Sequence, residues 1–479
     1  MENDTKIKEE EDPKKSEKTE KDGAQVEADP KKAEKEGVPV DENEQFKPAF
    51  DVLEGVQSAT APEYVDKIIE SALEHRASDV HLEPQQKIVY VRFRMDGVLY
   101  YVGKIEKISY ENILNRLKVK AHLRVDGHFS AQDGSMRYEK GDSKVDIRVS
   151  VIPTIEGEKV VMRMLAVYVA SLSLDDIGIS DEDQVKLIKA SKKPFGMVLM
   201  TGPTGSGKTT TLYAIVKTFH SSEINLTSIE DPVEYKIAGA NQIQVNLKTN
   251  LTFAKGLRSI VRQDPDIILV GEIRDNETAE IAVNAALTGH LLFSTFHAND
   301  AATGIPRLLD MGVEPFLLTS TLKLIAGQRL VRKICDKCKT KTTINLKDFN
   351  FIVPIPKGYF PSDTFEAYAG KGCSACADKG YKGRTAIFEF IEITPEMQEL
   401  MLKNPSSQEI WALAEKQGST SMFQDGVKKV IAGVTTLEEL LRVASPAEKE
   451  MSHTSKATPK QAPTAPTQPK EEKEDTKKE

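Results

Sequence analysis

Nine consecutive residues in the middle of the chain have the types and the spacing that suit a phosphate group. They are Gly202, Pro203, Thr204, Gly205, Ser206, Gly207, Lys208, Thr209 and Thr210. The first eight fit the pattern G-x-x-x-x-G-K-[ST] in full, between a predicted strand and a predicted helix. In such a loop, glycines turn backbone N–H groups toward phosphate, Lys208 reaches the β and γ phosphates of ATP, and Thr209 offers its hydroxyl to Mg²⁺. The alternative is a chance glycine-rich turn, and the flanking strand and helix argue against it.

A carboxylate at the end of a second apolar stretch could serve the same site. The run 267–272, IILVGE, predicts a buried strand that ends in Glu272. Buried strands often end this way, so the run alone says little. Because a phosphate loop lies about 60 residues upstream, we interpret the run as a Walker-B element, with Glu272 beside Mg²⁺ and its water ligands.

Further acidic and histidine residues follow other predicted strands. The segment SIEDPVEY carries Glu230, Asp231 and Glu234, and one of these could orient and deprotonate an attacking water. The alternative is a solvated acidic turn. His290 and His297 flank the predicted strand LLFSTF, where a histidine could sense the γ-phosphate or bond the acidic cluster. A purely structural role is the alternative for each histidine.

Four cysteines form two C-x-x-C pairs. The pairs are Cys335 with Cys338 and Cys373 with Cys376, and 34 residues separate them. Four thiolates suit a tetrahedral Zn²⁺ with no position left for water, so the predicted zinc site is structural. The alternative is a set of reduced, metal-free thiols.

Composition limits the classes of protein to which the chain can belong. Its 479 residues are 39% hydrophobic and 29% charged, with a net charge of −8. Residues 1–50 hold 16 acidic and 10 basic side chains, which is −6 of that charge, so the remainder is nearly neutral and does not favour nucleic acid as a direct partner. No run approaches the ~18 apolar residues of a membrane span, and the N-terminus lacks the apolar core of a signal peptide. We therefore expect a cytoplasmic chain whose membrane contact is indirect.

Patterns along the chain predict two folded regions. The first has helical spacing, then alternating strands around Asp96-Gly97 and around Glu156-Gly157, which indicates a small α+β domain. The second alternates strands with helices, which indicates an α/β fold with a mostly parallel sheet and helices on both faces. The expected segments are a disordered stretch 1–48, an α+β domain 58–165, a linker 166–180, an ATPase core 181–330, a zinc-binding insertion 331–390, a helical segment 391–445 and a disordered tail 446–479.

These segments together resemble the ATPases of type II secretion and type IV pilus assembly. The resemblance runs from about Tyr64 to Val443 and includes RASDVHLEP, GPTGSGKTTTLY, SIEDPVEY, the long segment from LRSIVRQDPD to FSTFHAND, the paired cysteines and a closing FQDGVKKVIAG segment. It implies a RecA-like P-loop ATPase core, a PAS-like domain before it, ATP with Mg²⁺ as ligands and a homohexameric ring.

The resemblance also implies roles for single residues. Glu234 is similar to the family's general base, Glu272 to its Walker-B glutamate, and His290 and His297 to its histidine box. Family members also bring arginines of the N-terminal domain to the nucleotide. Their counterparts here are Arg148 and Arg163, and Arg137 aligns less well.

The function that the resemblance implies is ATP hydrolysis that powers pilin or pseudopilin assembly through an inner-membrane platform protein. Retraction ATPases of the family typically lack the cysteine module, which favours assembly or secretion. A DNA-uptake or nucleic-acid translocation motor is the alternative within the same fold, and the nearly neutral core argues against it. A non-catalytic scaffold is a further alternative, and the intact Lys208, Thr209 and carboxylates argue against it.

Overall fold

The computed structural model describes residues 48–50, 52–53, 60–140, 143–165, 172–219, 221–349, 358–444 and 446. Met1–Lys47 and Pro48–Glu479 are separate units, and only the second contains described residues. The expected disordered segments 1–48 and 446–479 lie outside the described residues, apart from Pro48 and Pro446. The same holds for 166–171 of the expected linker.

The first folded region is a six-stranded antiparallel sheet with two helices. Its elements are α1 (Ala61–Glu74), β1 (Asp79–Pro84), β2 (Ile88–Met95), β3 (Val98–Glu106), α2 (Lys107–Lys120), β4 (Gln132–Lys140), β5 (Ser143–Thr154) and β6 (Gly157–Leu165). The strand order is β3-β2-β1-β6-β5-β4. The α+β fold of this region is therefore present, and its likeness to PAS domains stays a prediction.

Local sequence explains most of these elements. Every second residue of β2 is buried, and its turn into β3 has Asp96 and Gly97 at φ of 50° and 83°, a conformation that an Asp-Gly pair tolerates. Thr60 and Glu63 form a capping box at the start of α1. The sequence did not predict β4 as a strand, because only Met136 and Tyr138 of its side chains are buried.

The second region is built on a seven-stranded sheet. Its strands are β7 (Gly196–Thr201), β8 (Leu226–Glu230), β9 (Asn241–Gln244), β10 (Ile267–Ile273), β11 (Leu291–Phe296), β12 (Leu322–Ile334) and β15 (Tyr381–Glu392). They lie in the order β15-β12-β7-β11-β10-β8-β9, and all pairs are parallel except β12 with β15. The prediction of an α/β fold with a mostly parallel sheet is confirmed.

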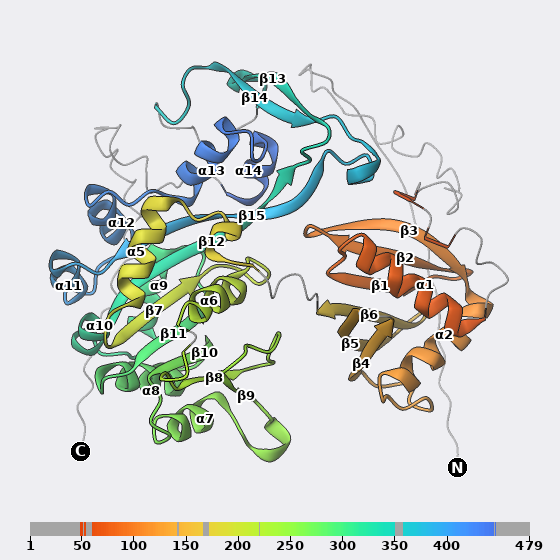
Figure 1. Cartoon of the computed structure of the whole chain (residues 1–479), viewed down its shortest axis with the longest axis horizontal. Helices are drawn as coiled ribbons and strands as arrows, with labels where there is room; N and C mark the ends of the chain where they lie inside the picture. The colour runs from red at the N-terminus through yellow and green to blue at the C-terminus, as the bar shows by residue number, and fades with distance from the viewer. Residues whose placement is uncertain are drawn as a thin grey trace, which may run out of the picture. The chain divides into compact units, whose positions relative to one another are not determined.

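Helices cover both faces of this sheet (Figure 1). Met197 and Leu199 of β7 face one hydrophobic cluster, while Val198 and Met200 face the other, as the alternation of a strand requires. The second cluster contains α4 (Leu174–Ile177), α5 (Asp181–Ser191) and α6 (Lys208–Lys217). The first contains α7 (Phe253–Ile260), α8 (Asn276–Leu287), α9 (Ala301–Asp310), α10 (Pro315–Thr321), α11 (Pro395–Met401) and α12 (Ser407–Lys416). A short 3₁₀ helix, η2 (Leu247–Thr249), precedes α7.

An excursion from this sheet carries the cysteines. It leaves β12 at Cys335 and returns to β15 after Gly380, so the expected insertion 331–390 also includes parts of two strands of the core sheet. The excursion contains β13 (Lys339–Asn345), η3 (Leu346–Asp348), β14 (Thr364–Gly370) and η4 (Ser374–Cys376). Helices α13 (Met422–Ile431) and α14 (Leu437–Val443) pack with it in a separate hydrophobic cluster.

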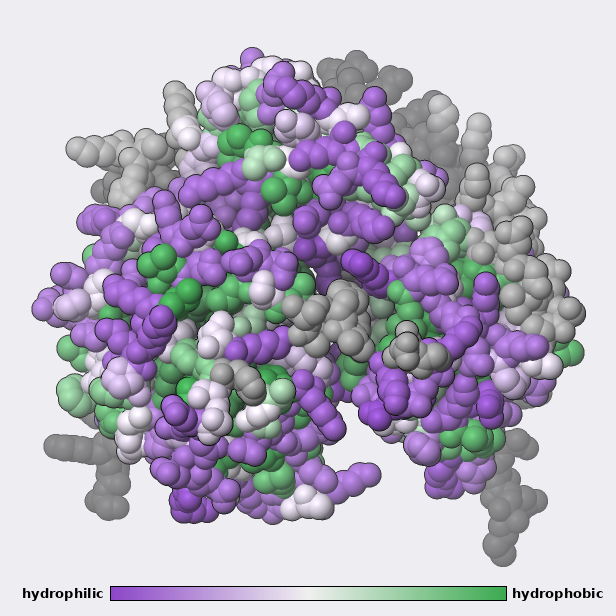
Figure 2. All heavy atoms as spheres, in the orientation of Figure 1, coloured by the Kyte–Doolittle hydropathy of each residue, from purple (hydrophilic) through white to green (hydrophobic). Residues whose placement is uncertain are grey.

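Apolar side chains are concentrated in these buried clusters. On the face drawn in Figure 2, hydrophilic residues predominate and hydrophobic ones occur in small groups between them. Among the helices that the structure describes, none combines the length and the apolar character needed to cross a membrane.

Candidate functional site

The phosphate loop joins β7 to α6 at the carboxyl edge of the parallel strands. Gly202, Gly205 and Gly207 have φ of 141°, 78° and 86°, the region that favours glycine. A Cβ on Gly202 would lie 2.4 Å from the backbone oxygen of Gln328, so this position has no room for a side chain. Ser206 Oγ is buried and has no hydrogen-bond partner among the described residues. A tight glycine turn with a spare buried hydroxyl, leading into a helix N-terminus, fits a phosphate ligand.

Lys208 begins α6 and folds back over the loop. Its Nζ donates to the backbone oxygens of Gly202 at 2.7 Å and Pro203 at 3.0 Å. Burial lowers the pKa of Lys208 from 10.5 to about 8, although the charge of Glu272 acts in the opposite direction. A buried ammonium that only carbonyl oxygens satisfy gains more from an anion than an exposed lysine would.

Glu272 stands where β10 departs from regular pairing. The register between β10 and β11 shifts between Val270 and Ile273, and this irregularity contains Glu272. His297 Nε2 lies 2.9 Å from Glu272 Oε2, and the Arg274 guanidinium forms an ion pair with the other carboxylate oxygen. Burial raises the pKa of Glu272, but the bonds from Arg274 and His297 outweigh it and hold this pKa below its ordinary value. The carboxylate is therefore charged at neutral pH.

The three carboxylates after β8 have different surroundings. Glu230 is buried and accepts hydrogen bonds from Tyr213 and Ser228, and burial raises its pKa. Asp231 lies 3.4 Å from Arg274, which links it to Glu272. Glu234 keeps 40% of its side chain exposed, so water can reach this candidate base.

Three arginines of the first region, Arg137, Arg148 and Arg163, line a cleft that also contains the phosphate loop and Glu234. Arg148 NH1 lies 3.6 Å from Glu234 Oε2, and its NH2 donates to the Val233 oxygen at 2.6 Å. Arg163 instead pairs with Asp79 at 3.0 Å, and Arg137 pairs with Asp146 at 2.7 Å. Only Arg148 among these three therefore bonds to a predicted catalytic segment.

The structure separates the two histidines. His297 follows β11 and reaches Glu272, whereas His290 precedes β11 and its Nδ1 lies 2.8 Å from the Ala285 oxygen at the end of α8. A strand of this length spans ~20 Å, so His290 lies at the edge opposite the phosphate loop. Within one chain, His290 therefore contacts the end of α8 rather than Glu272, and its expected catalytic role stays a prediction.

A cleft of about 1480 Å³ is lined by most of the predicted site residues. Its lining includes Pro203, Thr204, Gly205, Ser206, Gly207, Lys208, Thr209, Thr210, Glu234, Glu272, His297, Arg148, Arg163 and Arg137. The cleft thus holds a phosphate loop and carboxylates that could bind Mg²⁺ or orient water. It also holds cations that could stabilise the negative charge that develops on the transferring phosphoryl group.

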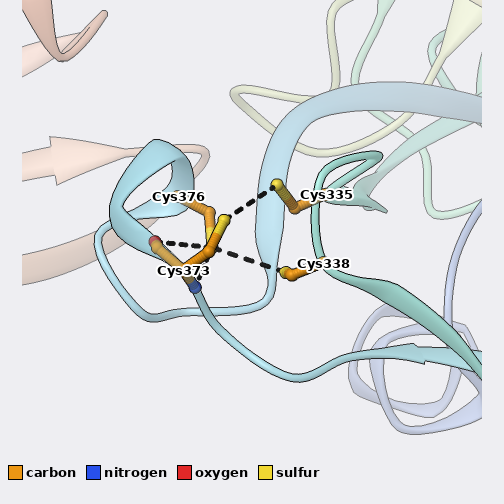
Figure 3. A group of neighbouring side chains, drawn as sticks. All are labelled: Cys335, Cys338, Cys373 and Cys376. Carbon is orange, nitrogen blue, oxygen red and sulfur yellow. Dashed lines mark hydrogen bonds between the residues drawn. The ribbon is translucent and has the colours of Figure 1, made fainter.

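The four cysteines form a second candidate site. Figure 3 shows the pairs Cys335 with Cys338 and Cys373 with Cys376 pointing toward one another from two loops. Sulfur–sulfur distances of 3.9, 3.8 and 3.7 Å match the ~3.8 Å edge of a tetrahedron with Zn–S bonds of ~2.3 Å. They are far longer than the ~2.05 Å of a disulfide. The four thiols fit a zinc ion.

Comparison with known proteins gives one family. The family described as "Type II/IV secretion system protein" matches residues 54–442. The chain belongs to this family. Type II secretion system protein E of Pseudomonas aeruginosa is 43% identical over 393 residues, which are 82% of this chain and 77% of that protein. The type IV pilus assembly ATPase PilB of Myxococcus xanthus is 43% identical over 400 residues, 83% of this chain and 70% of that protein.

Solved structures support the fold of this type II/IV secretion family member. The ATPase DotB of Legionella pneumophila has a TM-score of 0.60 at 20% identity, over 80% of this chain and 95% of that one. The pilus retraction motor PilT with bound ADP has a TM-score of 0.54 at 24% identity, over 80% of this chain and 97% of that one.

Two residues of this secretion-family site were missed from the sequence. Arg274 lies two positions after Glu272, and its signal in the sequence is a basic residue directly after a strand with an acidic end. Gln328 bonds to the phosphate loop from β12. Its signal in the sequence is a lone amide directly after the apolar run LIAG of β12.

Proposed function

We propose that this chain is the ATP-hydrolysing motor of a type II secretion system or of a type IV pilus assembly machine. The chain is an ATP hydrolase, because its family and its relatives are secretion and pilus assembly ATPases. The observation that carries the proposal is the shared cleft, in which Lys208, Glu272 and His297 lie together. We further propose that the motor is a cytoplasmic homohexamer that contacts the inner membrane through a platform protein.

The residues of the cleft have separate tasks in this proposal. The phosphate loop and Lys208 bind the β and γ phosphates, and Thr209 and Glu272 would hold Mg²⁺. Bound with ATP, Mg²⁺ neutralises charge on the phosphate oxygens. Glu234 takes the proton of the attacking water. His297 and Arg274 hold the Glu272 carboxylate in place and keep it charged.

Arginine from the first region completes the site. Arg148 already bonds to the segment of Glu234, so it is the arginine best placed to stabilise charge on the transferring phosphoryl group. Arg163 would need to leave Asp79 to do the same. We propose Arg148 as the main contributor and Arg163 as a secondary one.

The cysteine cluster has a structural task. Cys335, Cys338, Cys373 and Cys376 would hold Zn²⁺, with no open position for water. The metal would fix the excursion between β12 and β15, which has a small hydrophobic cluster of its own.

ATP hydrolysis by the purified full-length chain tests the proposal. We expect Mg²⁺-dependent release of phosphate, lost in Lys208→Ala, and stimulation by the cytoplasmic part of a platform protein or by lipid rather than by DNA. Absence of hydrolysis in the wild-type chain under all these conditions would refute the motor function. Stimulation by DNA alone would favour the nucleic-acid motor instead.

A further inference from the structure

A buried amide supports the phosphate loop from outside it. Gln328 lies in the middle of β12, the strand that pairs with β7, and its relative exposure is 1%. Its neighbours on either side in the strand are Gly327 and Arg329. A buried amide is costly unless its donor and its acceptor both find partners, so the partners of Gln328 show what the residue does there.

Both ends of the Gln328 amide bond to the start of the nucleotide site. Nε2 donates to the backbone oxygen of Ser206 at 2.8 Å, and Oε1 accepts from the Thr211 hydroxyl at 2.9 Å. Ser206 lies in the phosphate loop, and Thr211 lies in the first turn of α6. A neutral amide carries both a donor and an acceptor, so it can donate to the Ser206 oxygen and accept from the Thr211 hydroxyl at the same time.

The loop also packs against Gln328 at both of its ends. A Cβ on Gly202 would lie 2.4 Å from the Gln328 backbone oxygen, and a Cβ on Gly207 would lie 2.9 Å from Gln328 Nε2. Both glycines have positive φ. A side chain at Gly202 therefore has no space beside the Gln328 backbone, and a side chain at Gly207 would displace the Gln328 amide.

These contacts determine the direction of a backbone donor. The peptide between Ser206 and Gly207 is planar and trans, so its N–H points opposite to its carbonyl. Because the Ser206 oxygen is fixed toward Gln328, the N–H of Gly207 points away from β12. Inward N–H groups of this kind are what a phosphate loop offers to its ligand.

We propose that Gln328 is a positioning residue for nucleotide binding: its amide fixes the Ser206 carbonyl and the first turn of α6, so that the loop's N–H groups are aimed at phosphate before the nucleotide arrives. The proposal rests on the proposed function of the loop as an ATP site. Gln328 itself does not touch the phosphates. Its contribution is preorganisation, which strengthens binding without a direct contact.

The affinity of the full-length chain for Mg·ADP tests this role. Gln328→Leu keeps the approximate volume but leaves the Ser206 oxygen and the Thr211 hydroxyl without their partner. We expect its Kd for a fluorescent ADP analogue to rise on the order of tenfold or more. Gln398→Leu is the matched control, because Gln398 also donates to a backbone oxygen, that of Thr319, away from the loop. It should leave the Kd unchanged even if both variants lower the unfolding temperature.

The outcomes separate the two proposals. An unchanged Kd in Gln328→Leu, with a wild-type chain that binds ADP, would overturn the role of Gln328 alone. If the wild-type chain binds no better than Lys208→Ala, the proposed ATP site itself fails.

A second variant covers the case in which Gln328→Leu does not fold. Gln328→Glu keeps the acceptor for Thr211 but loses the donor to Ser206 while its carboxyl is charged. Burial raises the pKa of a carboxyl, and the protonated form donates again. We expect the ADP affinity of this variant to recover toward that of the wild type as the pH is lowered from 8 to 6. Parallel pH profiles for the two chains would overturn the proposal.

Discussion

His297 Nε2 lies 2.9 Å from Glu272 Oε2, which ties the end of β11 to the end of β10 at the edge that carries the phosphate loop. Arg274 bonds the other carboxylate oxygen and lies 3.4 Å from Asp231. Arg274 thus links the carboxylate of Glu272, near the end of β10, to that of Asp231, directly after β8, and His297 bonds to Glu272 as well. This arrangement holds the orientation of Glu272 from two sides.

The histidines offer a test with an internal control. His297→Ala removes the bond to Glu272, and we expect kcat for ATP hydrolysis to fall on the order of 10- to 100-fold. His290→Ala should leave kcat unchanged, since His290 lies at the opposite end of β11. Steady-state phosphate release measures both. Equal losses of kcat in the two variants would mean that His290 contacts a nucleotide site in another way, for example the site of a neighbouring chain.

Removing the charge of Glu272 should separate binding from hydrolysis. Glu272→Gln keeps the shape of the side chain and leaves the phosphate loop unchanged, so we expect the affinity for ADP to stay within the range of the wild type. We expect kcat to fall about 10²-fold or more. Equilibrium titration and single-turnover hydrolysis measure the two steps. A variant that hydrolyses ATP at the wild-type rate would contradict the Walker-B assignment.

Arginine from the first region should act on hydrolysis more than on binding. Arg148→Ala removes the cation next to Glu234, and we expect a loss of kcat on the order of 10²-fold or more. Arg124→Ala is the control, because Arg124 is exposed and pairs with Asp126 in its own loop. Unaltered hydrolysis in Arg148→Ala would shift the role to Arg163.

Nucleotide affinity should depend on pH through Lys208. Burial lowers its pKa to about 8 in the nucleotide-free chain, and bound phosphate would stabilise the charged form and raise it. Affinity is therefore full below pH 8 and falls as the pH rises above 8, by at most about tenfold per pH unit. Titrations between pH 7 and 9.5 measure this. Lys208→Arg keeps its charge throughout and should give a flat profile; an equally steep profile in that variant would exclude Lys208 as the cause.

Removal of metal should destabilise the excursion between β12 and β15. We expect about one zinc per chain by elemental analysis. Chelation or Cys338→Ser should lower the unfolding temperature by roughly 5 °C or more and expose the excursion to protease. Ser374→Ala is the control variant, because Ser374 is an exposed neighbour of the cluster. It should change neither the unfolding temperature nor the sensitivity to protease. A zinc-free chain with the unfolding temperature of the zinc-loaded form would contradict a structural metal.

Much of the site was predictable because its residues are contiguous or follow strands. The phosphate loop lies within nine residues, and its strand and helix have clear apolar periodicity. Glu272 lies near the end of β10 and Glu234 follows β8, and the carboxyl ends of these parallel neighbours meet at one edge. The four cysteines could be paired with zinc from type and spacing alone, and their mutual distances agree.

Other features depended on contacts that the sequence does not display. His290 and His297 flank β11 symmetrically in the sequence, and the direction of that strand in the sheet decides which one meets Glu272. The polar β4 carries little hydrophobic alternation, so its place at the sheet edge was not predictable.

The phosphate loop, the metal-binding residue types and the alternation of strands and helices were predictable because each depends on neighbours along the chain. The tertiary structure decided which side chains meet. Gln328 and Ser206 are 122 positions apart in the sequence. They form a hydrogen bond because β12 pairs with β7 and so brings the buried amide of Gln328 next to the phosphate loop. Hydrogen bonds act over about 3 Å, so partners this distant in sequence are set by strand order and register rather than by local pattern.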